Sequence, residues 1–514
     1  MHRSVVPFAI LTVLASFFML AFGLDSEGSQ AAGMSDGDLE MVAPDVVPAS
    51  PFPLLALWDP WDWHDSASLF QPVDSLTLEP LPGYEPIEIE RGQAGGFIET
   101  AVSPDGTVAA LVAHIPGDPM SSMDPGKVVL HIVDLVEWTE SSVAEWPMAM
   151  GYADAANPQF SVDGSHLYWT ARTRGTGMRV LHRLDLNSGA REQIGSLPAD
   201  FVPLDYRISF DERMWYVFGV PVQQNLSTLN GYVLGEFAAG DAQLLIFDLE
   251  RPEEIETVEL VDVLSGSVPV DSREPDAYPI DVVTPGLDWS ADGTRLYVGL
   301  ADSPEGVVVD LEAGEVLDRY TLDEGASWLE RFGAWLVPSA SAAARGVMNG
   351  FALDLEDRKA VAFANAYEIL SSDRQELQTA AHYPVWLMDL ETGRQLWQSH
   401  VLGIVALARI PGSDHLIVHT ASDVYFVDDR DENNEHALRI LDISSGDVLN
   451  TFELPGRPLR GRESMVLSRQ YAYVAVITDN GSEVIVVDLD SLSEVGGWTA
   501  EEGEPGIGQL LPLP

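Results

Sequence analysis

The sequence contains no cysteine and only two lysines, Lys127 and Lys359, among its 514 residues. Without cysteine the chain forms no disulfide, carries no thiolate nucleophile and offers no cysteine ligand to a metal. Basic residues are few altogether: 27 Lys and Arg stand against 81 Asp and Glu, a formal net charge of −54. This charge repels nucleic-acid phosphates and anionic lipids, so we predict no nucleic-acid partner. It favours cations, basic partners and solubility at high salt.

The motifs of several common enzyme classes are also absent. The sequence has no Gly-x-Ser-x-Gly elbow, no His-Glu-x-x-His, no P-loop and no dinucleotide-binding Gly-x-Gly-x-x-Gly. His415 and His419 are four residues apart, which places both on one face of a strand. The sequence identifies no third metal ligand for them, so we interpret them as a packed or surface pair. No catalytic residue can be named.

The N-terminus has the pattern of an export signal. Met1-His2-Arg3 is followed by an apolar stretch of 19 residues, Val5–Gly23, and then by Asp25. A bilayer-spanning helix needs about 20 apolar residues, so an uncleaved membrane anchor is the alternative. We predict that residues 1–23 are a signal peptide or an anchor. The rest of the chain would then be extracytoplasmic: secreted, at the cell surface, or anchored to the membrane through this segment alone.

Residues 24–90 are rich in Pro, Asp, Ser and Gly, a composition that predicts a linker. Within it lies an aromatic and acidic run, Trp58-Asp-Pro-Trp-Asp-Trp-His-Asp65. One interpretation is a recognition strip. We favour the other, an anchor that docks the linker onto the folded body, because exposed tryptophan clusters are costly.

Beyond this segment the sequence is repetitive. Seven times a short apolar run ends in Asp followed by Leu or Ile, at intervals of about 46 to 79 residues. The seven Asp residues are Asp134, Asp185, Asp248, Asp310, Asp389, Asp442 and Asp488. Four copies continue into a turn that ends in Gly, at Gly189, Gly314, Gly393 and Gly446. A period of this size predicts a repeat architecture.

The fullest copy, residues 286–322, contains four short strands, which we name a to d in chain order. Ser290-Ala-Asp-Gly293 makes the a–b turn, in which Gly293 can adopt positive φ without strain. Ser103-Pro-Asp-Gly106 and Ser161-Val-Asp-Gly164 repeat it, and Ser209-Phe-Asp-Glu212 is a degenerate copy. Each Asp of the Asp-Leu steps is predicted to hold a turn, because seven repeated copies cannot all face one substrate.

Four antiparallel strands repeated seven times predict an all-β fold, a seven-bladed β-propeller in residues 91–503. The blades are placed at 96–148, 156–198, 204–260, 284–322, 346–400, 402–455 and 462–500. Residues 504–514 form a C-terminal tail. Ring closure is predicted to use the strand 86–90, the tail, or both.

The Ser-x-Asp-Gly and Asp-Leu-x-x-Gly turns, with the apolar strands beside them, resemble those of a known group across about 400 residues. The group is the bacterial exported WD-repeat-like propellers, including the TolB-type and the YVTN (YncE-type) proteins. The resemblance implies blade geometry, with binding and scaffolding as the usual roles. Asp389–Trp397 also resembles the repeat of quinoprotein propellers, but it occurs once, which gives little support to a bound quinone.

The densest group of oxygen ligands lies between strands of the sixth blade. Asp428, Asp429, Asp431 and Glu432 could bind Ca²⁺, which takes six to eight oxygen ligands. The segment lacks the glycine and the alternating spacing of a dedicated calcium loop. We therefore favour the alternative, a solvated charged loop.

Long insertions are predicted at one end of the blades only. They are b–c connections (115–126, 220–241, 365–384, 428–436) or d–a connections (261–284, 323–345), and the a–b and c–d turns stay short. Loops on one end of a rigid scaffold usually carry binding. We predict a binding or scaffold protein with a protein, cationic or saccharide ligand on this face. The alternatives are a lactonase-type or quinone-dependent enzyme with acidic residues around a central channel, and a structural cell-surface protein.

Overall fold

The computed structural model describes residues 53–59, 67–91, 98–115, 126–147, 156–172, 178–221, 228–229, 232–233, 240–269, 280–283, 285–290, 292–300, 305–321, 344–345, 349–355, 359–369, 377–382, 385–389, 394–399, 401, 404–420, 436–458, 465–478, 481–500 and 506–513. Every regular element in these residues is a β-strand. Within them, no helix is long and apolar enough to cross a bilayer. The predicted signal or anchor, residues 1–23, lies outside the described residues.

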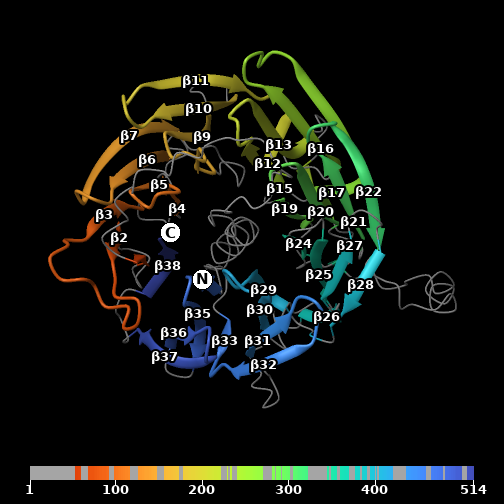
Figure 1. The fold of residues 1–514 in the computed structure, drawn as a ribbon. Helices are drawn as coiled ribbons and strands as arrows, with labels where there is room; N and C mark the ends of the chain where they lie inside the picture. Colours follow the sequence, from red (N-terminus) through yellow and green to blue (C-terminus); the bar gives the residue numbers. More distant parts are fainter. Residues whose placement is uncertain are drawn as a thin grey trace, which may run out of the picture. The chain divides into compact units, whose positions relative to one another are not determined.

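The chain divides into two compact units. The first unit comprises Met1–Ala199 and Gly461–Pro514. It contains three of the predicted blades, and Figure 1 shows the first of them, β4 to β7, as four successive strands. The strands are, in blade 1, β4 (Ile98–Val102), β5 (Val108–Ile115), β6 (Lys127–Asp134) and β7 (Thr139–Pro147); in blade 2, β8 (Gln159–Phe160), β9 (His166–Arg172), β10 (Arg179–Asp185) and β11 (Arg191–Ser196); and in blade 7, β34 (Met465–Leu467), β35 (Tyr471–Thr478), β36 (Gly481–Asp488) and β37 (Ser493–Thr499).

The second unit, Asp200–Arg460, contains the other four predicted blades. Its strands are, in blade 3, β12 (Phe201–Ile208), β13 (Met214–Pro221), β16 (Gly240–Asp248) and β17 (Ile255–Pro269); in blade 4, β19 (Gly286–Trp289), β20 (Arg295–Gly299), β21 (Glu305–Asp310) and β22 (Glu315–Thr321); in blade 5, β24 (Asn349–Leu355), β25 (Lys359–Ile369), β27 (Trp386–Asp389) and β28 (Arg394–Gln398); and in blade 6, β29 (Ile404–Arg409), β30 (His415–Thr420), β31 (Ala437–Asp442) and β32 (Val448–Glu453). Shorter strands are β14 (Thr228–Leu229), β15 (Tyr232–Val233), β18 (Ile280–Val283), β23 (Ala344–Arg345), β26 (Leu377–His382) and β33 (Arg457–Pro458).

The seven predicted blades are confirmed. In each, the four strands pair antiparallel in the order a–b–c–d, which is the blade of a β-propeller, so the all-β propeller class is confirmed as well. Strand b is largely buried in several blades, as in β5, where only Val108 is not buried. Strand d is the most exposed, as in β32, where five of six residues are exposed. Apolar clusters fill the space between consecutive sheets within a unit.

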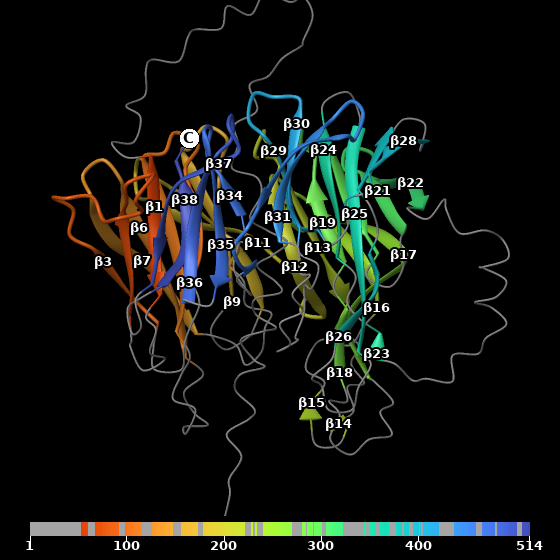
Figure 2. The ribbon, with the colours of Figure 1, turned by 90° about the horizontal axis from the view of Figure 1, so that it is seen from below.

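A further sheet, which we call the end sheet, joins the two ends of the described chain. Its order is β3-β2-β1-β38, with β1 (Leu54–Asp59), β2 (Ala67–Pro72), β3 (Ile87–Glu90) and β38 (Gly506–Pro512). Strand β1 pairs antiparallel with β38 from Leu54↔Pro512 to Asp59↔Gly506, and Figure 2 shows the two side by side. The prediction that both the tail and the strand near residue 90 take part in closure therefore holds within this sheet.

The end sheet corrects the prediction of a linker for residues 54–90, which contain three strands; residues 24–52 lie outside the described residues. Leu54, Leu55, Ala56 and Leu57 are all buried, with at most 4% of their surface exposed. A strand that is buried on both faces appears in sequence as a short continuous apolar run. Averaging composition over the surrounding Pro- and Ser-rich residues concealed that run. Part of the predicted C-terminal tail is likewise strand β38.

The Ser-x-Asp-Gly turns share one hydrogen-bond arrangement. In blade 4 the Ser290 hydroxyl donates to Asp292 Oδ1 (2.6 Å) and accepts from the backbone N–H groups of Thr294 and Arg295. Asp292 Oδ1 also accepts from the Thr294 N–H at 2.9 Å. Ser103, Ser161 and Ser209 hold their turns through equivalent bonds to Asp105, Asp163 and Asp211. These bonds join residues close in sequence, which explains why the turn could be recognised from the sequence.

The Asp of the Asp-Leu step holds the c–d turn, as predicted. Asp310 Oδ1 accepts from the N–H groups of Glu312 (2.9 Å) and Ala313 (2.8 Å). Corresponding bonds to turn N–H groups occur at Asp134, Asp185, Asp248, Asp442 and Asp488. The turn that follows Asp389 lies outside the described residues.

Candidate functional site

Two ends of each sheet are distinguished by their connections. The loop end carries the b–c and d–a connections, and the turn end carries the a–b and c–d turns. In the second unit the predicted insertions at the loop end contain additional strands: β14 and β15 in the b–c connection of blade 3, β18 after β17, and β23 and β26 around blade 5. Figure 2 shows all five beyond the same end of the blade strands. Part of the loop end is therefore built from paired strands.

Two blade strands extend into this region. β17 has 15 residues: Ile255–Leu260 and Leu264–Ser265 pair with β16, and Gly266–Pro269 pair with β18. β25 has 11 residues; Lys359–Ala362 pair with β27, whereas Asn365–Ile369 pair with β26. Continuing a blade strand into an insertion fixes the direction of the added backbone, because β18, β23 and β26 are hydrogen-bonded to strands anchored in a blade, whereas β14 and β15 pair with each other.

A buried carboxylate–imidazole pair lies at the loop end of the first unit. Glu99 comes from β4 and His114 from β5, and His114 Nε2 is 2.5 Å from Glu99 Oε1. The His114 side chain is fully buried and that of Glu99 is 12% exposed. Sequence reasoning missed this pair. The available signal was a histidine at the end of the otherwise apolar run Val108–Ala113.

The Glu99 carboxylate also ties blade 1 to blade 2. Oε1 accepts from the N–H of Ala156 at 2.9 Å, and Oε2 accepts from the N–H of Asn157 at 2.6 Å. Ala156 and Asn157 lead into strand β8, and Asn157 has a φ of 48°. Both carboxylate oxygens are thus occupied by groups of the protein itself. This arrangement fits a structural tie better than a general base, which needs an oxygen within reach of a substrate proton.

A second buried imidazole lies at the loop end of the second unit, in blade 6. His419 is fully buried near the end of β30, and burial together with the neighbouring His436 lowers its pKa to about 3. Arg439 donates to the Thr420 hydroxyl, which donates to the Ala437 carbonyl at 3.1 Å. His419 is therefore a packed, neutral histidine, as predicted, and His415 at the other end of β30 is only partly buried.

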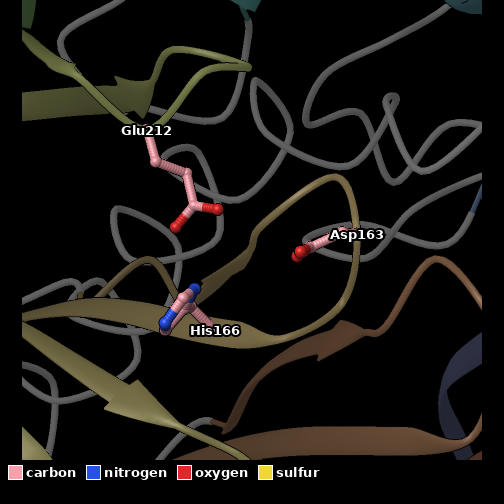
Figure 3. A group of neighbouring side chains, drawn as sticks. All are labelled: Asp163, His166 and Glu212. Atoms are coloured by element: carbon pink, nitrogen blue, oxygen red, sulfur yellow. The ribbon is translucent and has the colours of Figure 1, made fainter.

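Figure 3 shows Asp163 and His166, two side chains at the turn end of blade 2 in the first unit. Asp163 Oδ1 accepts from the N–H and the hydroxyl of Ser165 (2.9 and 2.7 Å), and Ser165 Oγ is 3.0 Å from His166 Nδ1. The hydrogen bond from the Ser165 N–H has the largest effect on the pKa of Asp163, followed by the bonds from the Ser165 and Ser161 hydroxyls. Together they lower this pKa to about 2. Glu212, also drawn, belongs to the second unit, where it occupies the Gly position of the degenerate turn with a φ of 56°. Both acidic residues belong to turns of the repeat.

Of the remaining predicted residues, the structure describes Trp58 but not the predicted calcium ligands. Asp428, Asp429, Asp431 and Glu432 lie outside the described residues, so the calcium site stays a prediction. Trp58 is 7% exposed and packs edge-on against Trp498, with ring centroids 5.0 Å apart. Trp58 is therefore a packed core residue of strand β1 and not the anchor of a linker. Residues 60–66, which include Trp61 and Trp63, are outside the described residues.

Comparison with known proteins supports the fold. No family model and no curated protein sequence matches the chain. Among solved structures, the dihydro-heme d1 dehydrogenase NirN is 14% identical with a TM-score of 0.52, over 91% of this chain and 76% of that chain. AztD from Citrobacter koseri is 11% identical (TM-score 0.45, 90% and 99%), and TolB from Acinetobacter baumannii is 14% identical (TM-score 0.28, 67% and 63%). The predicted resemblance to bacterial propellers is confirmed, and at these identities it is a resemblance of fold alone.

Proposed function

We propose that the chain is an exported binding or scaffold protein that presents the loop end of its blades to a protein or a small ligand. The observation that carries this proposal is the set of added strands at the loop end of the second unit. An insertion that pairs with anchored blade strands holds a defined surface, and binding surfaces commonly consist of connections held by a rigid scaffold. The apolar N-terminal run supports export.

The buried ionisable groups at the loop end favour binding over catalysis. Glu99 has both oxygens engaged, and His419 has a pKa held near 3, far below the range in which an imidazole transfers protons at neutral pH. The dehydrogenase activity named for NirN is a property of that protein and does not transfer at 14% identity. A lactonase-type or quinone-dependent enzyme and a structural cell-surface protein remain the alternatives.

A deletion at the loop end tests the proposal. Replacing residues 366–383 by a short Asn-Gly turn removes β26 and most of the part of β25 that pairs with it, but leaves the pairing of β25 with β27 from Lys359↔Asp389 to Ala362↔Trp386. We expect this variant to melt within a few degrees of the parent. The probe is the exported protein fraction of the source cells, cross-linked to the purified chain, and the same fraction is tested with Glu312→Ala, a change at the turn end.

Cross-links that disappear in the deletion and persist in Glu312→Ala support the proposal. Identical cross-linking in both variants contradicts it. Hydrolysis of gluconolactone by the purified chain above the uncatalysed rate would establish the enzyme alternative. Self-association of the chain at micromolar concentration in sedimentation, without a cross-linked partner, would establish the structural one.

A further inference from the structure

The c–d turns of several blades have a left-handed residue four positions after the Asp. Gly189, Gly314 and Gly446 occupy this position with φ of 70°, 66° and 73°. Glycine reaches this region without strain, because it has no Cβ. In blades 1 and 7, which pack on either side of the end sheet within the first unit, the position is held by Trp138 (φ 50°) and Leu492 (φ 47°). A bulky side chain with such a φ is strained, and it persists only where surrounding contacts compensate.

Trp138 has such contacts with the end sheet. Its indole Nε1 donates to the Glu85 carbonyl at 2.8 Å. Its ring stacks on Phe70 (centroids 5.9 Å apart, 16° between planes) and meets Tyr84 edge-on at 5.7 Å. Phe70 belongs to β2. Tyr84 and Glu85 belong to residues 73–86, which connect β2 to β3 and correspond to the c–d connection of a blade. This connection is long, whereas most other c–d connections in the described residues are tight turns.

A hydrogen bond between blades 5 and 6 also joins a tryptophan to a carbonyl of a neighbouring sheet, and it can be compared with that of Trp138. Trp397, on strand d of blade 5, donates its Nε1 to the Ile443 carbonyl in the c–d turn of blade 6 at 2.7 Å. Its ring covers Gly446 so closely that a Cβ there would lie 2.5 Å from Trp397 Cε3. Between the end sheet and blade 1 the two partners are exchanged. The tryptophan donor lies in the c–d turn of blade 1, and the carbonyl acceptor lies in the end sheet, which precedes blade 1 in the chain.

We infer that Trp138 is a latch for the strap, residues 81–86 of the end sheet, and that the strap can be released while blade 1 stays folded. Pro82, Gly83, Glu85 and Pro86 are exposed, so the strap has little burial of its own. Glu85 and Tyr84 contact blade 1 through Trp138. The turn that carries Trp138 is held independently, because Asp134 accepts from the N–H groups of Val136 and Glu137, and Leu135 donates to the Thr107 carbonyl.

The latch is reversible because few contacts close it: one hydrogen bond and two ring contacts. The left-handed conformation of Trp138 belongs to the c–d turn of blade 1, which stays folded when the strap opens. The device is therefore a strap at the turn end of the end sheet that opens locally. Strand β1, which pairs with β2 on one side and with β38 on the other, stays paired.

Limited proteolysis of the full-length chain with chymotrypsin tests the latch, because the bond after Tyr84 lies within the strap and the Tyr84 ring packs on Trp138. We expect Trp138→Gly to raise the rate of cleavage after Tyr84 roughly tenfold, the ratio for a lost hydrogen bond and ring stacking. Cleavage after Leu111 in β5 and after Leu130 in β6 should not change. Trp138→Phe keeps the stacking and loses the indole donor, so its rate should lie between the two.

Gly189→Ala is the matched control, because the same turn position of blade 2 has nothing within 4 Å of a Cβ. It adds the left-handed strain without new contacts, so its melting temperature should fall while cleavage after Tyr84 stays at the parental rate. A higher melting temperature in Trp138→Gly with unchanged cleavage after Tyr84 would show that the tryptophan is merely tolerated. A parallel rise of cleavage in β5 and β6 would show unfolding of the blade. Either result overturns the latch.

Discussion

The backbone N–H of Leu311 donates to the carbonyl of Thr294 at 2.9 Å, and this bond ties the c–d turn of blade 4 to its a–b turn. The same tie joins Leu135 to Thr107, Leu186 to Ser165, Leu249 to Arg213, Ile443 to Asp414 and Leu489 to Gln470. The two residues of the Asp-Leu step therefore have separate roles. Asp holds its own turn, and Leu, which is 2% exposed at position 311, joins that turn to the neighbouring one.

Asp310→Ala should destabilise the protein without affecting binding at the loop end. The change removes the acceptor of the Glu312 and Ala313 N–H groups, which costs about 1 kcal/mol if one net hydrogen bond is lost. The measurement is the urea midpoint of unfolding. Asp310→Asn keeps an oxygen acceptor and should recover most of the loss. An unchanged midpoint in Asp310→Ala together with loss of a measured activity would contradict the structural role of the repeat Asp.

Gly446→Ala and Gly412→Ala should differ in cost, although both residues have left-handed φ, 73° and 71°. At Gly412 a Cβ meets nothing within 4 Å, so only backbone strain of about 1 kcal/mol is expected. At Gly446 the Cβ would lie 2.5 Å from the ring of Trp397, which adds an overpacking cost of about 1–3 kcal/mol. Thermal unfolding of the two variants measures the difference. Equal losses would mean that the indole moves aside without cost.

Acid should destabilise the chain between about pH 6.5 and 3 through the buried His419. Burial lowers the pKa of His419 from 6.5 to about 3, so the unfolded chain takes up a proton that the folded chain refuses. Stability from this group is present above the unfolded pKa and is lost as the pH falls through the window. The free energy of unfolding of His419→Leu, measured from pH 7 to 4, should fall less steeply than that of the parent. Parallel curves would refute the assignment.

The Ser-x-Asp-Gly turns should lose their contribution to stability at lower pH than the His419 site. Hydrogen bonds from Ser165 lower the pKa of Asp163 from 3.8 to about 2, and the pKa values of Asp105, Asp211 and Asp292 are lowered as well. A depressed carboxyl pKa contributes stability above pH 3.8 that is lost as the pH falls towards 2. Asp163→Asn should flatten the stability curve between pH 4 and 2, and above pH 5 it should lower the curve without changing its slope. A change of slope above pH 5 alone would assign the effect to another group.

Salt should stabilise the protein. A net charge of −54 over 514 residues produces self-repulsion in the compact state. The screening length shrinks from about 10 Å at 0.1 M salt to about 3 Å at 1 M, which weakens this repulsion. The melting temperature should therefore rise with NaCl from low to molar concentration. A flat or falling series would mean that the charges are dispersed or paired well enough for repulsion not to matter.

The sequence by itself determined the seven blades, because the bonds that define them join near neighbours. Ser290 reaches Asp292 and Arg295, and Asp310 reaches Ala313, so each turn has its own signature in residue types and spacing. Alternating strands between such turns admit few arrangements other than four-stranded antiparallel sheets.

Only the tertiary structure decided the end sheet and the ties between sheets. Leu55 pairs with Leu511 across almost the whole chain, and Glu99 accepts from Ala156 and Asn157 in the next blade. Such contacts depend on which backbone groups folding brings together, and no local spacing encodes them. For the same reason Trp138 was not recognised in the sequence: its role depends on Glu85, whose carbonyl it reaches only after the end sheet has docked on blade 1.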